Sequence, residues 1–479
     1  MKKLITGLLA VVLVMSCCAA IFASCGEPID YDHTIIFYST QNDDLQKLTD
    51  AVIAKFEAKF PGWKVDHQQP GGYDEVRKKI VSDLQGQSQP DLAYCYPDHV
   101  ALYMETSKVI DLTALMNSTE TLQNSNGETF TVGMTETQRN DFIPIYLEEG
   151  RATKFSSYSD YGYKEDSLLA LPFAKSTELL FYNADALKEC NLEPAKTWDE
   201  LWQQAPVLKA KFPEATILGY DSEANWFITE SERQGWGYTS TDVNKHYLFS
   251  NERAAKWLDE IQGYAKKGYV TTQTIYGSYT SNLFKKGVID KETKKPAAGA
   301  IYCVGSSGGA KNQATTAFNW GVAALPGSVV KNADGTPVKD DQGQNVVSNK
   351  VISQGPSLVM LKCDQAKDPD LKAKMTFMFM KELYDASYQA SVAQLQGYNP
   401  SVQSAIDLPA YQKFLATEGQ ITAMSAKIAT DIIDDYFTSY AFVGSSTARE
   451  QVGNVMVYVI KREKDGAKAL RDALKNCGG

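Results

Sequence analysis

The segment Gly305-Ser306-Ser307-Gly308-Gly309 is the part of the sequence closest to a catalytic motif. It has the G-x-S-x-G order of a nucleophile elbow, and the apolar run Ala300–Val304 before it predicts the strand that such an elbow follows. An α/β-hydrolase places its acid and then its histidine after the serine. All four histidines of this chain precede Ser307: His33, His67, His99 and His246. The motif therefore favours a glycine-rich turn where backbone comes close to another group, and we expect no catalytic residue.

The other residues that could do chemistry form neither a metal site nor a phosphate loop in the sequence. The cysteines beyond the N-terminal segment lie far apart without a C-x-x-C pair, at Cys95, Cys190, Cys303, Cys363 and Cys477. This spacing indicates neither a zinc site nor a disulfide framework. The histidines have no helical spacing, and no G-x-x-x-x-G-K-[ST] sequence is present. We therefore expect no metal and no cofactor.

The charge balance bears on the partners of the protein. Its formal net charge is −10, and removal of residues 1–24, which hold Lys2 and Lys3 and no acid, would make it −12. Nucleic-acid binding rests on neutralisation of phosphates by Lys and Arg, so we expect no nucleic-acid partner. A length of 479 residues with 43% hydrophobic residues predicts two or more domains with buried cores.

The N-terminal segment combines two lysines with an apolar run from Leu4 to Phe22, which is the pattern of a secretory signal. Phe22-Ala23-Ser24-Cys25 resembles the signal of bacterial lipoproteins, in which the chain is cut before the cysteine and the cysteine is acylated. The resemblance implies lipid attachment at Cys25. A plain secretory signal with an incidental cysteine is one alternative, and acylation of an earlier cysteine, at 17 or 18, is another.

Beyond the signal, strand patterns alternate with helix patterns. Strands are predicted at 34–39, 63–66 and 91–95, and a helix at about 73–84. The first helix is predicted from the helical spacing of Leu45, Leu48, Val52, Phe56 and Phe60, and Pro61-Gly62 ends it. This alternation favours a parallel α/β sheet. The polar segment 118–167 predicts an insertion with little core of its own, and two glycine turns within 328–349 predict a hairpin.

The most informative segment is LLALPFAKSTELLFYNADALKE, residues 168–189. An apolar strand ends in Pro172, a polar stretch follows, and a second strand ends in Tyr182-Asn183 before a helix begins. The segment resembles the signature of the extracellular solute-binding proteins of carbohydrate ABC importers, the family of maltose-binding protein. Four further motifs follow in the order of that family: Pro90–Ala93, Thr197–Leu201 after Pro194, Gly299–Gly305 and Trp320–Pro326. The resemblance covers nearly all of residues 34–476.

The resemblance implies an α/β protein with the two-lobe periplasmic-binding-protein-like fold (type II) and a hinge between the lobes. The expected organisation is a signal peptide at 1–24, a tether at 25–33, lobe 1 at 34–172 with its insertion, lobe 2 at 173–325, a return segment of lobe 1 at 326–400 and C-terminal helices of lobe 2 at 401–479. Crossings between the lobes are expected near Pro172 and Leu325, with a further return around Gly397–Ser404.

A carbohydrate site needs aromatic platforms for the C–H faces of the sugar and carboxylate, amide or hydroxyl groups for its hydroxyls. By resemblance, Trp226 falls where the family has a stacking aromatic, and Asp98 falls where it has a hydroxyl-binding acid. A core position is the alternative for Trp226, and a helix cap is the alternative for Asp98. Cys95 takes the place of a family tryptophan, for which Tyr94 and Tyr96 could compensate.

Further ligand-binding candidates come from loops that the resemblance places at the cleft. Ser176 stands where the family has a carboxylate, and Ser307 where it often has a tryptophan. Lys175 and the turn at 305–309 could supply positive charge and N–H groups to an anion. The remaining candidates are Gln41 and Asn42, which follow the first strand, together with Trp236, Phe442 and Ser445. Gly397-Tyr398-Asn399-Pro400 is interpreted as a structural turn.

The function implied is that of an extracytoplasmic lipoprotein that captures a carbohydrate, in particular an oligosaccharide, and delivers it to ABC permease subunits. We expect a monomer, anchored to the membrane by lipid at the cell surface or in the periplasm. One alternative keeps the fold and binds a glycerophosphodiester or another phosphorylated solute. Others are a secreted hydrolase, against which the order of serine and histidines argues, and a surface adhesin or signalling receptor with the same fold.

Overall fold

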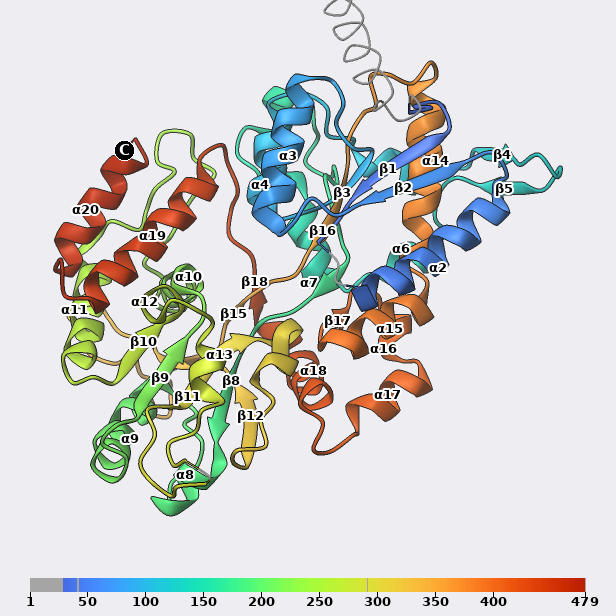
Figure 1. The fold of residues 1–479 in the computed structure, drawn as a ribbon. Coiled ribbons are helices and arrows are strands. Elements are labelled where there is room, and N and C mark those ends of the chain that lie inside the picture. Colours follow the sequence, from blue (N-terminus) through green and yellow to red (C-terminus); the bar gives the residue numbers. More distant parts are fainter. Residues whose placement is uncertain (1–28, 41–42, 291, 479) are drawn as a thin grey trace, which may run out of the picture.

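The computed structural model describes residues 29–478 apart from 41, 42 and 291, and these residues form two lobes, each built around a five-stranded sheet (Figure 1). The signal peptide, Cys25, Gln41 and Asn42 lie outside the described residues. The expected two-lobe α/β architecture is confirmed by these two sheets.

Lobe 1 contains a sheet of strand order β2-β1-β3-β16-β6. Its strands are β1 (Thr34–Tyr38), β2 (Lys64–Gln68), β3 (Leu92–Cys95), β6 (Leu171–Pro172) and β16 (Ser357–Met360), and its main helices are α2 (Asp43–Lys59), α3 (Tyr73–Gln85), α4 (Pro97–Met104) and α14 (Pro369–Glu382). Strands β1, β2 and β3 are parallel, as the alternation of strands and helices predicted, whereas β16 runs antiparallel to β3. Helix α2 buries its apolar positions Leu45, Ile53 and Phe56.

The insertion at 118–167 adds small elements to lobe 1. They are β4 (Thr121–Gln123), β5 (Thr129–Thr131), α6 (Glu136–Asn140), α7 (Pro144–Leu147) and short 3-10 turns, and α5 (Leu112–Met116) precedes them. Buried residues of the insertion, including Phe142 and Tyr146, join the main hydrophobic core of the molecule. These residues of the insertion therefore pack into the core that the rest of the molecule forms.

Lobe 2 contains a sheet of strand order β10-β9-β11-β8-β12. Its strands are β8 (Glu178–Asn183), β9 (Thr216–Tyr220), β10 (Val270–Thr272), β11 (Ala300–Ser306) and β12 (Trp320–Ala324); its helices are α8 (Ala184–Glu189), α9 (Trp198–Lys211), α10 (Glu223–Gln234), α11 (Glu252–Lys266), α12 (Gln273–Tyr276), α13 (Thr280–Phe284), α19 (Ser445–Ile460) and α20 (Gly466–Asn476). Helix α19 packs along α10, and α20 packs on α11 and α19 (Figure 1). The C-terminal helices thus complete lobe 2.

The predicted hairpin is present as β13 (Ser328–Val329) and β14 (Val347–Ser348), extended by bridges from Lys331 to Pro337 and from Lys339 to Asn345. It packs on α9 and α10, so it belongs to lobe 2 rather than to the expected return segment of lobe 1. Arg233, near the end of α10, binds the chain on both sides of the hairpin. Its guanidinium donates hydrogen bonds to Pro326 O at 2.6 Å and to Lys350 O at 2.7 Å.

The chain passes between the lobes through short strands. Near Pro172 the chain passes through β7 (Ala174–Lys175). After the hairpin, which packs on lobe 2, it passes through β15 (Val351–Ile352) rather than near Leu325. Strand β17 (Asn399–Pro400) pairs with β7, and β18 (Tyr436–Phe437) pairs with β15. Around these crossings lie α15 (Ala386–Gln396), α16 (Gln403–Ile406), α17 (Pro409–Leu415) and α18 (Ile421–Asp431).

Candidate functional site

A cavity of about 980 Å³ lies between the two lobes. Lobe 1 contributes residues of α3 and α4, and lobe 2 contributes residues of α10, the end of β11 and the first turns of α19. Residues Ile352–Gly355 of the crossing also line it. A cleft between two α/β lobes is the usual place for a ligand that the lobes close upon.

A buried carboxylate lies at the lobe 2 side of the cleft. Glu178, the first residue of β8, accepts a hydrogen bond from Tyr220 Oη at 2.5 Å and one from Asn225 Nδ2 at 3.0 Å. Burial raises the pKa of Glu178 to about 7, although both hydrogen bonds and the nearby guanidinium groups act in the opposite direction. The group therefore changes its charge near neutral pH.

Arg449 on α19 extends this network into the cleft. Its guanidinium donates a hydrogen bond to Asn225 Oδ1, and among the described residues no carboxylate forms an ion pair with it. Helix α19 begins after Gly444, which offers no side-chain cap, and its first residues, Ser445, Ser446 and Thr447, line the cavity. Free N–H groups and the helix dipole make such a helix start attractive to anions. Arg449 thus supplies a positive charge on a wall that also carries the acids Glu178, Glu223 and Glu450.

The lobe 1 wall carries aromatic rings and an acid. Tyr73 and Tyr96 lie with their ring centroids 4.8 Å apart, and both line the cavity. Asp98 on α4 accepts a hydrogen bond from the Ser446 hydroxyl at 2.7 Å, which joins the two lobes across the cleft. Burial alone would raise the pKa of Asp98, but His99, the Ser446 hydroxyl and Arg449 hold it below its ordinary value. Asp98 is therefore a charged acceptor at the closing edge of the cleft.

Four of the candidates from the sequence line this cleft: Tyr96, Asp98, Ser176 and Ser445. Asp98 lies within the first turn of α4, after the N-cap Tyr96, so it is not itself the cap. Ser176 accepts a hydrogen bond from the Ser306 hydroxyl at 3.2 Å, at the junction between the crossing and the end of β11. The structure therefore brings these four residues from both lobes to a single cavity.

Trp226 and Trp236 are not in the cleft. Trp226 is 2% exposed, and its ring stacks on Tyr220 with centroids 4.7 Å apart and an interplanar angle of 3°. Trp236 packs beside Trp257 at 5.6 Å, on a part of lobe 2 that shares no lining residue with the cleft. Trp226 therefore lies in the core of lobe 2, which was the alternative to a stacking platform for the ligand.

Tyr94 and Phe442 are also covered by protein. Tyr94 lies in the core of lobe 1 against Phe37 and Phe173, at centroid distances of 5.7 and 5.2 Å. Phe442 stacks on His246 at 4.2 Å with an interplanar angle of 4°. Neither ring lines the cavity, because each is an interior packing partner in its own lobe.

Ser307 is fully buried, and both its N–H and its hydroxyl are hydrogen-bonded to the backbone of Thr177. Its N–H donates to Thr177 O at 2.8 Å, and its hydroxyl accepts a hydrogen bond from Thr177 N at 3.2 Å. It therefore joins the turn after β11 to the crossing instead of facing a ligand. The neighbouring Gly308 does line the cavity, and a Cβ at that position would come within 2.3 Å of the Tyr398 ring. The glycine is needed there for close approach, as the sequence indicated.

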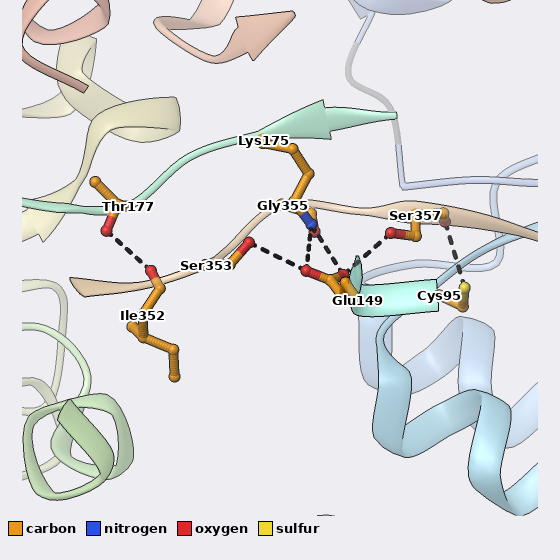
Figure 2. Close-up of polar contacts among 8 residues, drawn as sticks. All are labelled: Cys95, Glu149, Lys175, Thr177, Ile352, Ser353, Gly355 and Ser357. Atoms are coloured by element: carbon orange, nitrogen blue, oxygen red, sulfur yellow. Dashed lines mark hydrogen bonds and ion pairs between the residues drawn. The ribbon is translucent and has the colours of Figure 1, made fainter. Parts of the chain in front are cut away.

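Lys175 is likewise unavailable to a ligand, because it is completely buried and its charge is paired at the crossing (Figure 2). Its Nζ donates to both carboxylate oxygens of Glu149 at 2.9 Å and to Gly355 O at 2.9 Å. Ser353 and Ser357 each donate a hydroxyl hydrogen bond to Glu149 at 3.1 Å. The ion pair therefore fastens both crossing segments to the insertion of lobe 1, and Lys175 is a structural residue.

Several cleft residues had no distinctive sequence signal. Asn225 and Arg449 belong to no motif, and Glu178 lies within the 168–189 segment without being one of the positions that carry the resemblance. The three meet only because β8, α10 and α19 converge. Asp221 directly follows β9, and its place at the carboxyl end of a parallel strand is the signal that could have identified it. The sequence 397–400 predicts a structural turn, yet Tyr398 within it lines the cavity.

Neither a metal site nor a membrane span is found in the described part of the chain. No three His, Cys, Asp or Glu side chains there are grouped so that they could hold a metal ion. No helix within these residues has both the length and the apolar character needed to cross a membrane.

The two lobes, the strand crossings and the interlobe cavity define the class of two-lobe binding proteins that close on a solute. The chain belongs to the family of bacterial extracellular solute-binding proteins, whose pattern it matches over residues 51–418. It is 24% identical over 396 residues to the sn-glycerol-3-phosphate-binding periplasmic protein UgpB of Escherichia coli K12, which covers 80% of this chain and 77% of that protein.

Solved structures show the same fold. UgpB from Mycobacterium tuberculosis in complex with glycerophosphocholine has a TM-score of 0.69 at 19% identity, covering 93% of this chain and 97% of the other. The acarbose-binding GacH receptor of Streptomyces glaucescens has a TM-score of 0.66 at 18% identity, with 92% and 96% covered. The sugar-binding protein MalE from Xanthomonas citri has a TM-score of 0.65 at 15% identity, with 93% and 96% covered. The type II fold implied by the sequence is therefore confirmed.

Proposed function

We propose that this protein is the receptor of an ABC importer and that its cleft captures a glycerol phosphate or a glycerophosphodiester. The observation that carries the proposal is Arg449, a guanidinium that lines the cavity, donates to the Asn225 amide and forms no ion pair with a carboxylate in the described part of the chain. Glu178 and Asp98 nonetheless lie near enough to be affected by its charge. The first turn of α19 lines the same wall; Ser445 N donates to Phe442 O, whereas the N–H groups of Ser446 and Thr447 form no hydrogen bond with another described residue. Guanidinium and helix N-termini are the groups that bind phosphate best, because they combine charge with several N–H donors.

The rest of the cleft suits the uncharged part of such a solute. Glycerol hydroxyls can donate to Asp98 and Asp221, and Tyr73 and Tyr96 offer ring surface to its carbon atoms. Relatives point the same way, since one binds sn-glycerol-3-phosphate and another was solved with glycerophosphocholine. The sequence suggested Lys175 as the cation for a phosphate, but Lys175 is paired with Glu149, and we propose Arg449 for this role instead.

A carbohydrate, in particular an oligosaccharide, is the second candidate. It is favoured by the acids Asp98, Asp221 and Glu178, which accept hydrogen bonds from hydroxyls, and by the size of the cavity, about 980 Å³. Structures of similar fold bind acarbose and other sugars. The absence of tryptophan from the described lining of the cleft weighs against it, because large flat platforms are what a sugar ring needs.

The remaining parts of the proposal concern where the protein works. We propose that Cys25 is acylated and that the chain works as a monomer outside the cytoplasm, held at the membrane by its lipid. One acyl chain binds a membrane only marginally, so two or more are required for stable anchoring. The captured solute would pass to the permease without any reaction, since the family consists of binding proteins.

A thermal-shift experiment tests the proposed ligand. Glycerol 3-phosphate and glycerophosphocholine should raise the melting temperature of the purified protein, because a ligand that binds only the folded state stabilises it. Maltose, maltotriose and glycerol serve as comparisons without phosphate. A shift with maltotriose and none with either phosphate would replace the first candidate by the second. No shift with any of the five compounds would contradict both.

A further inference from the structure

A second pocket, of about 110 Å³, lies on lobe 2 between α9, the end of α10, α11 and the β13–β14 hairpin. It shares no lining residue with the cleft. Its walls are mainly aromatic, and we call it the tryptophan pocket: Trp198, Trp202, Trp226, Trp236, Trp257 and Tyr264. Five of the seven tryptophans of the chain line it, whereas the described lining of the cleft contains none.

The rings form a continuous surface. Trp202 stacks on Tyr264 with centroids 4.1 Å apart and an interplanar angle of 12°, and Trp198 lies 5.7 Å from Trp226. Trp257 lies between two other rings, with its centroid 6.1 Å from that of Trp226 and 5.6 Å from that of Trp236. Trp236, Trp257 and Tyr264 remain partly exposed. A molecule entering the pocket would therefore meet ring surface that the protein itself leaves uncovered.

The hairpin that forms one wall is held in place by hydrogen bonds. Arg253 Nη2 donates to Lys331 O at 2.7 Å and to Gln234 O at 2.8 Å. Gln234 in turn donates to Val329 O at 2.9 Å and accepts from Lys331 N at 2.9 Å. The pocket is therefore formed before any ligand arrives, which lowers the cost of binding.

The charges around the pocket cancel. Three acids, Asp199, Glu230 and Glu260, face three bases, Arg253, Lys256 and Lys331. Glu260 is already paired with Lys331 at 3.2 Å, and Glu230 accepts the Ser328 hydroxyl at 2.6 Å. Asp199 is exposed and forms no hydrogen bond or ion pair with another described residue. The balance favours an uncharged ligand over a phosphate or an ammonium, and Asp199 offers that ligand an acceptor.

We propose that the tryptophan pocket binds a single pyranose ring of a saccharide. The C–H face of a pyranose packs on aromatic rings, and its hydroxyls need both acceptors and donors, which the rim supplies. The pocket, of about 110 Å³, is smaller than the ~150 Å³ cavity that holds a benzene ring, so only part of one sugar unit would lie inside it, and the rest of that ring and any further units would lie in solvent. This site is separate from the cleft and does not depend on what the cleft binds.

Tryptophan fluorescence can detect binding in this pocket, because five tryptophans line it. Trp226 stacks on Tyr220, whose hydroxyl donates to Glu178 of the cleft, so the cleft variant below is needed to separate the two sites. The purified protein is titrated with glucose, galactose, mannose and N-acetylglucosamine, and with phenol as a planar aromatic probe. We expect a saturable fluorescence change with at least one sugar. Asp199→Asn and Trp236→Ala should each raise its dissociation constant at least tenfold, whereas Arg449→Ala with Asp98→Ala in the cleft should leave it unchanged.

The matched variants decide the outcome. Melting curves confirm that each variant folds, and Asp199→Asn, an exposed and nearly isosteric change, keeps the test valid if Trp236→Ala does not fold. A signal lost in the cleft variant and kept in Asp199→Asn would assign the sugar to the cleft and overturn the proposal. Saturation with phenol alone, or no saturable change with any sugar at tens of millimolar, would also overturn it.

Discussion

Replacing Lys175 with methionine should destabilise the protein by about 3–4 kcal/mol at pH 7. The change removes the cation from the pair that fastens the crossing segments and leaves the Glu149 carboxylate, 3% exposed, with only Ser353 and Ser357 as side-chain donors. Breaking a buried ion pair by removing one partner costs about 3–5 kcal/mol, because an uncompensated charge remains. Methionine has nearly the length of the lysine stem, so little packing is lost.

The pH dependence of this loss can be derived from the same pair. The variant can avoid the unpaired charge by binding a proton, and protonating an ordinary glutamate side chain costs about 4 kcal/mol at pH 7 but only about 1 kcal/mol at pH 5. The loss in stability should therefore shrink to about 1 kcal/mol at pH 5. Replacing both Lys175 and Glu149 by methionine should recover most of it, since no buried charge is left.

Urea unfolding followed by circular dichroism at pH 7 and pH 5 measures these values. Lys47→Met is the matched control, because Lys47 on α2 is 77% exposed and 3.6 Å from Asp44. Such an exposed pair contributes little, so the control should unfold like the original protein. Equal stability of Lys175→Met and the original protein at pH 7, or a loss that is the same at both pH values, would refute the reasoning.

Three further predictions concern the cleft and the anchor. Arg449→Ala should weaken binding of a glycerophosphodiester by about 1.5–3 kcal/mol, which isothermal titration would measure as a roughly 10- to 150-fold rise in Kd, and unchanged affinity would exclude Arg449 as the phosphate ligand. Because burial raises the pKa of Glu178 to about 7 from 4.5, the folded state holds a proton that the unfolded chain releases between these values, so stability falls as pH rises through this window. Glu178→Gln should flatten that decline in melting temperature, and an identical slope in the variant would contradict the assignment. Cys25→Ala should release the protein from the membrane fraction or leave it unprocessed, whereas a cleaved variant that stays membrane-bound would disprove the lipid anchor.

The fold could be predicted because its signals are local. Leu45, Leu48, Val52, Phe56 and Phe60 are spaced for one face of a helix. The structure buries Leu45, Phe56 and Phe60, and it packs the partly buried Leu48 and Val52 against the core. The alternation of strands and helices in residues 34–95 predicted a parallel sheet, and β1 does pair in parallel with β2 and β3. The second crossing was misplaced because it depends on where the 328–349 hairpin packs, and the contacts of Arg233 with Pro326 and Lys350 that hold it join residues about a hundred positions apart. No sequence window contains that information.

The candidate site was harder to predict, because its chemistry is assembled from distant segments. Asp98 was a candidate because the family resemblance places a hydroxyl-binding acid there, and Tyr96 because it could compensate for Cys95; the structure places both in the lining of the cleft. Arg449 was missed because it lies in an ordinary helical sequence, and only its position opposite Asp98 gives it a role. Trp226 was misplaced because an aromatic residue beside a loop has the same pattern whether it faces a ligand or, as here, stacks on Tyr220.

The most direct test of the proposed function is a crystal structure of the protein with glycerophosphocholine. The proposal predicts the phosphate in the interlobe cleft, with an oxygen about 3 Å from the Arg449 guanidinium and the start of α19, and glycerol hydroxyls toward Asp98 or Asp221. A phosphate bound elsewhere in the cleft, with Arg449 still bonded only to Asn225, would contradict it. So would a crystal grown with both glycerophosphocholine and maltotriose in which the sugar alone occupies the cleft.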